Sequence, residues 1–108
     1  MNNAAELDVG PLTWVKGEID LALDRALEAL DRHPPGSDDA TQLRSARNQL
    51  HQAHGALSIV GLDGVTRFSE SLEHLLDDVE SGEIAYDAQV AAAARGGVTA
   101  IRQYLDDL

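Results

Sequence analysis

The chain has no cysteine, which excludes a disulfide framework and any metal site built on thiolates. Aromatic residues make up only 4% of it, and alanine and leucine dominate the apolar residues. This mixture favours packed helices over β-sheets, whose strands prefer β-branched and aromatic residues. No apolar run approaches the roughly 20 residues that a membrane span needs.

Basic residues are also scarce, with 8 against 19 acidic residues and a net charge of −11. Such a chain is repelled by nucleic acid and by anionic lipid, so we expect neither as a partner. The charge gives no encouragement to self-association, and we expect a monomer. The N-terminus lacks the basic residues and the apolar run of a signal peptide, which indicates a cytoplasmic protein.

Helical periodicity occupies four segments of the 108 residues, enough for one domain. We expect helices that open at 8–11, after a cap among 37–39, at a cap on Asp63, and near Ala85. Short connections make neighbouring helices antiparallel, so the predicted fold is an all-α, up-down-up-down antiparallel four-helix bundle. Residues 1–8 lack periodicity and are expected to be flexible, which leaves 9–108 as the bundle domain.

The apolar stripes predict which residues form the core. On the second helix the stripe is Leu43, Ala46, Leu50, Ala53, Leu57 and Val60. On the third helix it is Val65, Phe68, Leu72, Leu75 and Val79. We also expect the lone tryptophan, Trp14, to pack in the core, and His33 only to end the first helix before two prolines.

The second helix breaks the charge pattern, because residues 40–62 include no carboxylate. Its polar residues step by three and four, which places them in one row on the solvent side of the apolar stripe. We call them the basic row: Arg44, Arg47, His51, His54 and Ser58.

Two interpretations of the basic row are open. In the first, the row only pairs with acidic residues of the third helix, namely Glu70, Glu73, Asp77 and Asp78. In the second, His51 is a nucleophile, since a solvent-facing imidazole keeps an unprotonated nitrogen near neutral pH. Gly55, one turn along the helix, leaves the flank of His51 open. The absence of carboxylates from the helix also suits this interpretation, because a carboxylate would repel a phosphoryl group attached to His51.

The segment 51–61 resembles the signature of histidine phosphotransfer (HPt) domains. His51 stands at the phosphoacceptor position, Gly55 and Ala56 follow at the small positions, and Val60-Gly61 matches the aliphatic-glycine pair. The Leu72-Glu73 pair of the next helix also fits. One position departs, because His54 stands where the family usually has a lysine, which is a permanent cation near pH 7.

The resemblance implies a phosphoryl carrier. A histidine kinase catalytic domain would phosphorylate His51, and an aspartate of a response-regulator receiver domain would take the group. Arg47, His54 and Gly55 would support the site, and the receiver would contact the residues Arg44, Ser58, Ile59 and Leu62. The alternative is a helical adaptor that keeps the fold and binds signalling partners without being phosphorylated.

No nucleotide-binding motif appears, so the chain is not expected to be an enzyme by itself, although a longer parent protein could be a kinase. We expect no cofactor. His51 and His54 have the spacing of a metal-binding pair, but their own segment offers no acidic third ligand, so no metal site is predicted.

A narrower resemblance concerns residues 12–15 and 42–53. They are similar to the N-terminal region of the large CheA-like chemosensory kinases of type IV pilus systems. That resemblance implies a role in signalling that controls pili and surface (twitching) motility, in which this chain would be one domain of a longer protein.

Overall fold

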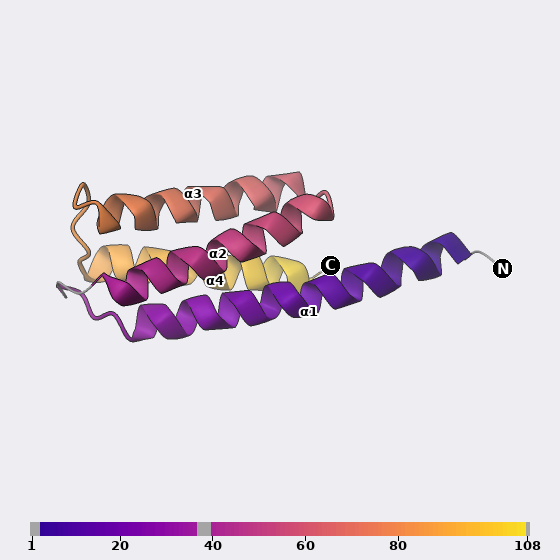
Figure 1. Ribbon diagram of the computed structural model, residues 1–108, viewed down its shortest axis with the longest axis horizontal. Coiled ribbons are helices and arrows are strands. Elements are labelled where there is room, and N and C mark those ends of the chain that lie inside the picture. Colours follow the sequence, from indigo (N-terminus) through magenta and orange to yellow (C-terminus); the bar gives the residue numbers. More distant parts are fainter. Residues whose placement is uncertain (1–2, 37–39, 108) are drawn as a thin grey trace.

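The computed structural model describes residues 3–36 and 40–107 of the chain. They form four helices: α1 (Asn3–Asp31), α2 (Thr41–Ile59), α3 (Asp63–Glu80) and α4 (Ala88–Asp106). Successive helices run in opposite directions along the same long axis (Figure 1). The predicted all-α, up-down-up-down four-helix bundle is therefore confirmed.

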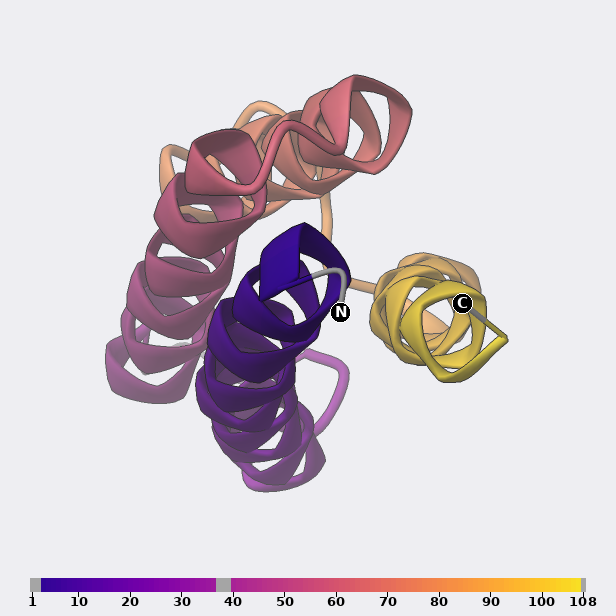
Figure 2. The ribbon, with the colours of Figure 1, turned by 90° about the vertical axis from the view of Figure 1, so that its right-hand side faces the viewer.

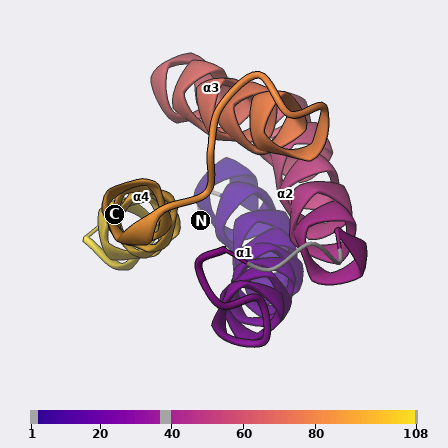
Figure 3. The ribbon, with the colours of Figure 1, turned by 90° about the vertical axis from the view of Figure 1, so that its left-hand side faces the viewer.

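Each helix packs against two neighbours. α2 lies between α1 and α3, and α4 packs against α1 and α3 on the other side of the bundle. The two views along the axis show this arrangement (Figures 2 and 3). The first turns of α1 extend beyond the ends of the other helices (Figure 1). α2 therefore has one flank against α3 and a face left open to solvent.

The core follows the predicted stripe on α2 closely. Within the helix, every member of that stripe is buried: Leu43, Ala46, Leu50, Ala53 and Leu57. Val60, just past the helix end, is half-buried. Across the part of the chain with described coordinates, no helix has both the length and the apolar character needed to cross a bilayer.

The predicted stripe on α3 is wrong at two positions. Phe68 is 44% exposed and Leu75 is only half-buried. The residues that α3 buries are Val65, Ser69, Leu72, Leu76 and Val79. Both sets alternate steps of three and four, so the apolar pattern alone leaves the rotation of the helix ambiguous. The observed rotation turns the acidic side of α3 toward α2, where it forms ion pairs.

Several helix starts differ from the prediction. α1 begins at Asn3, because the good helix formers of 4–7 continue the helix upstream of Pro11. Residues 3–8, expected outside the bundle helices, are therefore helical. α3 has Leu62 at its N-cap position and includes Asp63. α4 starts at Ala88 and has Asp87 at its N-cap position, where the Asp87 carboxylate accepts a 2.8 Å hydrogen bond from the Val90 amide.

α2 begins at Thr41 with Ala40 at its N-cap position. The residues predicted to cap it, Ser37, Asp38 and Asp39, lie outside the described residues. 

The turn between α2 and α3 is fixed by its backbone. The Leu62 amide donates to the Leu57 carbonyl at 3.2 Å, and the Gly61 amide donates to the Ser58 carbonyl at 3.1 Å. Gly61 has a φ of 77°, the left-handed conformation that glycine adopts without strain. This pair of bonds is the Schellman motif, which ends α2 and sets the register of α3 against it.

Two single-residue expectations are also corrected. Trp14 is 69% exposed rather than part of the core, and it lies at the surface beside Ala56 and Ile59 of α2. His33 does follow the end of α1 but is 3% exposed. Its ring packs edge-on against Tyr86, with 4.9 Å between ring centroids, so it also helps to close that end of the bundle.

Candidate functional site

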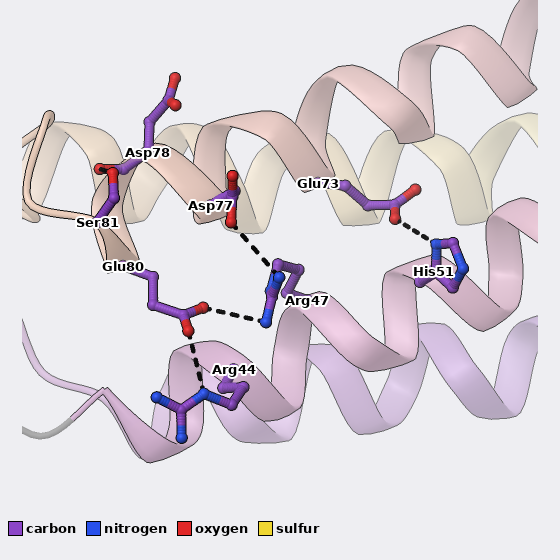
Figure 4. A network of polar contacts seen from close by, with 8 residues as sticks. All are labelled: Arg44, Arg47, His51, Glu73, Asp77, Asp78, Glu80 and Ser81. Atoms are coloured by element: carbon purple, nitrogen blue, oxygen red, sulfur yellow. Dashed lines mark hydrogen bonds and ion pairs between the residues drawn. The ribbon is translucent and has the colours of Figure 1, made fainter.

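His51 lies in the middle of α2, and its side chain is 74% exposed. Its Nδ1 atom is 2.8 Å from Oε1 of Glu73 on α3 (Figure 4). Its Nε2 atom has no hydrogen-bond partner among the described residues. The imidazole is therefore held at one nitrogen and presented to solvent through the rest of the ring.

The contact with Glu73 determines which nitrogen of His51 carries the proton. An ionised carboxylate only accepts hydrogen bonds, so Nδ1 is the donor of this pair. In the neutral ring the other nitrogen, Nε2, then has a free lone pair. The tautomer is thus inferred from the partner, and it makes the exposed nitrogen the nucleophilic one.

Glu73 bridges two histidines. Its side chain is 13% exposed, and its Oε2 atom is 2.9 Å from Nδ1 of His54. Nε2 of His54 is 3.6 Å from Oε2 of Glu70, one turn back on α3. The rings of His51 and His54 lie with 5.9 Å between centroids. His54, 22% exposed, therefore faces the carboxylate that orients His51.

The two arginines of the basic row are paired as well. Arg44 Nε is 3.0 Å from Glu80 Oε1. Arg47 contacts Asp77 at 3.4 Å through Nη1 and Glu80 at 3.3 Å through Nη2 (Figure 4). Both arginines therefore pair with the acidic helix, as the first interpretation expects, although Glu80, the partner of both, is not among the four acidic residues that it names.

This pairing corrects one prediction. The absence of carboxylates from 40–62 predicts an acid-free surrounding for a phosphoryl group on His51, and that prediction is wrong. In three dimensions α3 supplies acidic partners to Arg44, Arg47, His51 and His54, and one of them, Glu73, touches His51. The acid-free composition of α2 is explained by its acidic neighbour, because like charges across the helix pair would repel.

Glu73 is not among the predicted site residues. In the sequence it stands out only as part of a family signature and as a possible ion-pair partner. The available signal was the short turn, since helices joined by a tight connection face each other at positions equally distant from it. His51 and Glu73 are each 11 residues from Leu62.

The remaining predicted residues lie farther along α2. Gly55 is exposed, and a Cβ added to it would meet no atom within 4 Å. Ser58 and Ile59 are also exposed, and Ile59 lines an apolar surface depression with Trp14 and Ala56. Leu62 is half-buried and packs against the core, about three helical turns from His51. It is thus distant from His51.

The fold and this site define a class: a helical bundle that exposes a carboxylate-held histidine on its second helix. The chain matches the family model described as Hpt domain over residues 12–108, and it belongs to that family. Hpt domains are phosphocarrier modules that interact with kinases and receiver domains in phosphorelays. Comparisons with curated proteins and with solved structures gave no match.

Proposed function

We propose that this domain carries a phosphoryl group on Nε2 of His51. A histidine kinase catalytic domain supplies the group, and an aspartate of a receiver domain removes it. The observation that carries the proposal is the exposed imidazole with its Nδ1 atom 2.8 Å from Glu73. That contact leaves the solvent-facing nitrogen with the lone pair.

The chemistry needs little from this chain beyond that ring. The Nε2 lone pair attacks the γ-phosphorus of ATP held by the kinase, the P–O bond to ADP breaks, and a P–N bond forms. The ring then has substituents on both nitrogens and carries a positive charge, which the Glu73 carboxylate stabilises through Nδ1–H. When the receiver aspartate attacks the phosphorus, the P–N bond breaks and the neutral imidazole returns.

His54 acts in this scheme as a positioning residue. Its Nδ1 atom lies 2.9 Å from the second oxygen of Glu73, so it restrains the carboxylate that orients His51. Arg47, the other predicted supporting residue, is engaged by Asp77 and Glu80. We infer that Arg47 holds α3 in register rather than contacting the phosphoryl group directly.

Gly55 supports access of the partner to His51. Glycine inside a helix costs about 1 kcal/mol relative to alanine. Packing within the bundle does not require a glycine at position 55, because an added Cβ would meet no atom within 4 Å. The exposed apolar residues Trp14 and Ile59 lie near the same end of α2 and suit the buried centre of a docking interface.

A second candidate function is the non-phosphorylated adaptor. It is favoured by the ion pairs of the basic row, since both arginines already bind carboxylates. It is also favoured by His54 at the position where the family usually has a lysine. For either function, the resemblance of residues 12–15 and 42–53 to the kinases of type IV pilus systems supports a place in pilus signalling. For the phosphotransfer function, the use of ATP by the kinase supports a cytoplasmic location.

A relay experiment separates the two functions. The domain is incubated with a histidine kinase and radiolabelled ATP, and a receiver domain is then added. We expect acid-labile, alkali-stable label on this chain, followed by its loss as the receiver becomes labelled. A chain that binds both partners in a pull-down but takes up no label would be an adaptor, and the phosphotransfer proposal would be wrong.

A further inference from the structure

Three potential metal ligands meet beside the nucleophile. One ligand atom from each of His51, His54 and Glu73 lies within 4.8 Å of the others. The histidines are three residues apart on one face of α2, and the carboxylate reaches them from α3. The segment around His51 and His54 includes no acidic third ligand, which is why the sequence predicts no metal site, and the packing of α3 against α2 supplies one.

We propose that His51 Nδ1, His54 Nδ1 and the Glu73 carboxylate bind a divalent cation of the zinc type. Two imidazoles and one carboxylate are a known ligand set for Zn²⁺, with a water molecule in the fourth position. The set is unsuited to Mg²⁺ and Ca²⁺, which prefer oxygen ligands. The exposed flank of His51 leaves room for the water.

The present distances are close to those that the ion requires. His51 Nδ1 is 2.8 Å from Oε1 of Glu73, and His54 Nδ1 is 2.9 Å from Oε2 of the same carboxylate. Ligand atoms at about 2.0–2.1 Å from a tetrahedral zinc ion are about 3.3 Å apart. Each contact must therefore open by about half an ångström. Rotation of the exposed His51 ring opens the first contact, and rotation of the His54 and Glu73 side chains opens the second.

The carboxylate has unused acceptor capacity at this place. Oε2 of Glu73 is buried and accepts no well-aligned hydrogen bond from the described residues, although His54 Nδ1 is only 2.9 Å away. A buried carboxylate oxygen without a directed donor is energetically unfavourable. Coordination of a cation between the two atoms satisfies the oxygen and the ring nitrogen together.

The cation and the phosphoryl group exclude each other, a consequence that rests on the proposed function. Without metal, Nδ1–H of His51 donates to Glu73 and Nε2 has the lone pair. With Nδ1 bound to the cation, the proton of the neutral ring moves through solvent to Nε2. Nε2 then has no lone pair, and it cannot attack phosphorus. Zinc therefore inhibits loading of this domain.

Metal binding is tested first, without any phosphorylation. Tag-free, unphosphorylated protein is titrated with ZnCl₂ in an isothermal calorimeter, beside His54→Gln, Glu73→Gln and the control His74→Gln. His74 is exposed on α3 and lies outside the cluster. We expect one site per chain and at least about tenfold weaker binding in the first two variants, since even outer-shell changes cost that much. His74→Gln should bind like wild type, and MgCl₂ should give no matching isotherm.

The site is wrong if wild type binds no zinc, or if His54→Gln and Glu73→Gln bind it as tightly as wild type. Equal binding of Mg²⁺ would show only attraction to a protein of net charge −11. Circular dichroism of each variant shows whether the variant is folded. A ¹H–¹⁵N spectrum of the wild-type imidazoles follows the position of the ring protons. That spectrum should show the His51 proton move from Nδ1 to Nε2 on adding zinc.

The exclusion is tested separately with phosphoramidate, a small phosphoryl donor that needs no kinase. Labelling of wild type with saturating zinc is expected to fall at least tenfold relative to labelling without it. In His54→Gln the ratio of labelling with and without zinc should stay near one. Wild-type labelling that zinc does not change contradicts the exclusion. If no protein is labelled in the absence of zinc, the proposed function fails while the calorimetric result stands.

Discussion

Replacing His51 with glutamine is expected to abolish phosphorylation of this domain and leave its fold unchanged. Glutamine has no nitrogen lone pair that can attack phosphorus, since its amide nitrogen is not nucleophilic. The wild-type side chain is 74% exposed and lies outside the core, so the thermal midpoint should move by no more than a few degrees. Kinase-dependent labelling and circular dichroism melting of the same preparations measure both effects.

The matched control is His74→Gln. His74 is also an exposed histidine, but it lies on α3 and outside the contacts of the basic row. It should be labelled at the wild-type rate. Residual label on the His51→Gln variant would assign the phosphoryl group to another side chain and remove the basis for the site described above.

Replacing Glu73 with alanine is expected to slow phosphorylation of His51 about ten- to a hundredfold. The alanine variant has no acceptor for Nδ1–H, so the imidazole loses its fixed tautomer and orientation. It also loses the carboxylate that stabilises the charged ring in the phosphorylated product. We take this size of effect from metal sites, where removing the hydrogen-bond partner of a metal-bound histidine costs about ten- to a hundredfold, because such partners orient an imidazole ring in the same way. The initial rate of labelling at saturating kinase measures it.

Glu70→Ala is the control for this change. Glu70 is on the same helix and lies 3.6 Å from Nε2 of His54, but it has no contact with His51. Its loss should change the rate less than threefold. If Glu73→Ala and Glu70→Ala slow labelling equally, the effect is one of surface charge on α3 and not of orientation.

Much of the fold follows from the sequence because its apolar spacing and its helix-stopping residues agree. The buried face of α2 was predicted throughout the helix. The rotation of α3 was not, because Phe68 and Leu75 satisfy the helical period as well as Ser69 and Leu76 do. Ion pairs with the basic row resolve this ambiguity, and these are contacts between helices that a pattern within one helix does not contain.

The candidate site was predicted only in part for the same reason. His51, the proposed phosphoacceptor, and its open flank at Gly55 lie on one helix, so spacing places them together. The partner of His51 comes from another helix, and only the register of the α2–α3 turn identifies it. Four pairs between the two helices are equally far from Leu62: 8 residues for His54 and Glu70, 11 for His51 and Glu73, 15 for Arg47 and Asp77, and 18 for Arg44 and Glu80. Two further pairs, His54 with Glu73 and Arg47 with Glu80, differ by three residues, or about one helical turn.

The exposure of Trp14 illustrates a further limit. A lone tryptophan on an amphipathic helix is most simply assigned to the core, since large aromatic side chains gain most from burial. In this bundle it lies instead on the surface near Ile59 and Ala56. Spacing along α1 does not reveal this, because the neighbours of Trp14 depend on how far α1 extends beyond the ends of the other helices.

The central claim is that Glu73 holds Nδ1 of His51 and leaves Nε2 to accept the phosphoryl group. The most direct test is a ¹H–¹⁵N correlation spectrum of the imidazole groups, recorded before and after phosphorylation of the wild-type domain. We predict a His51 ring protonated on Nδ1 before the reaction and phosphorylated on Nε2 after it. A phosphoryl group on Nδ1, or on any other histidine, would contradict the account.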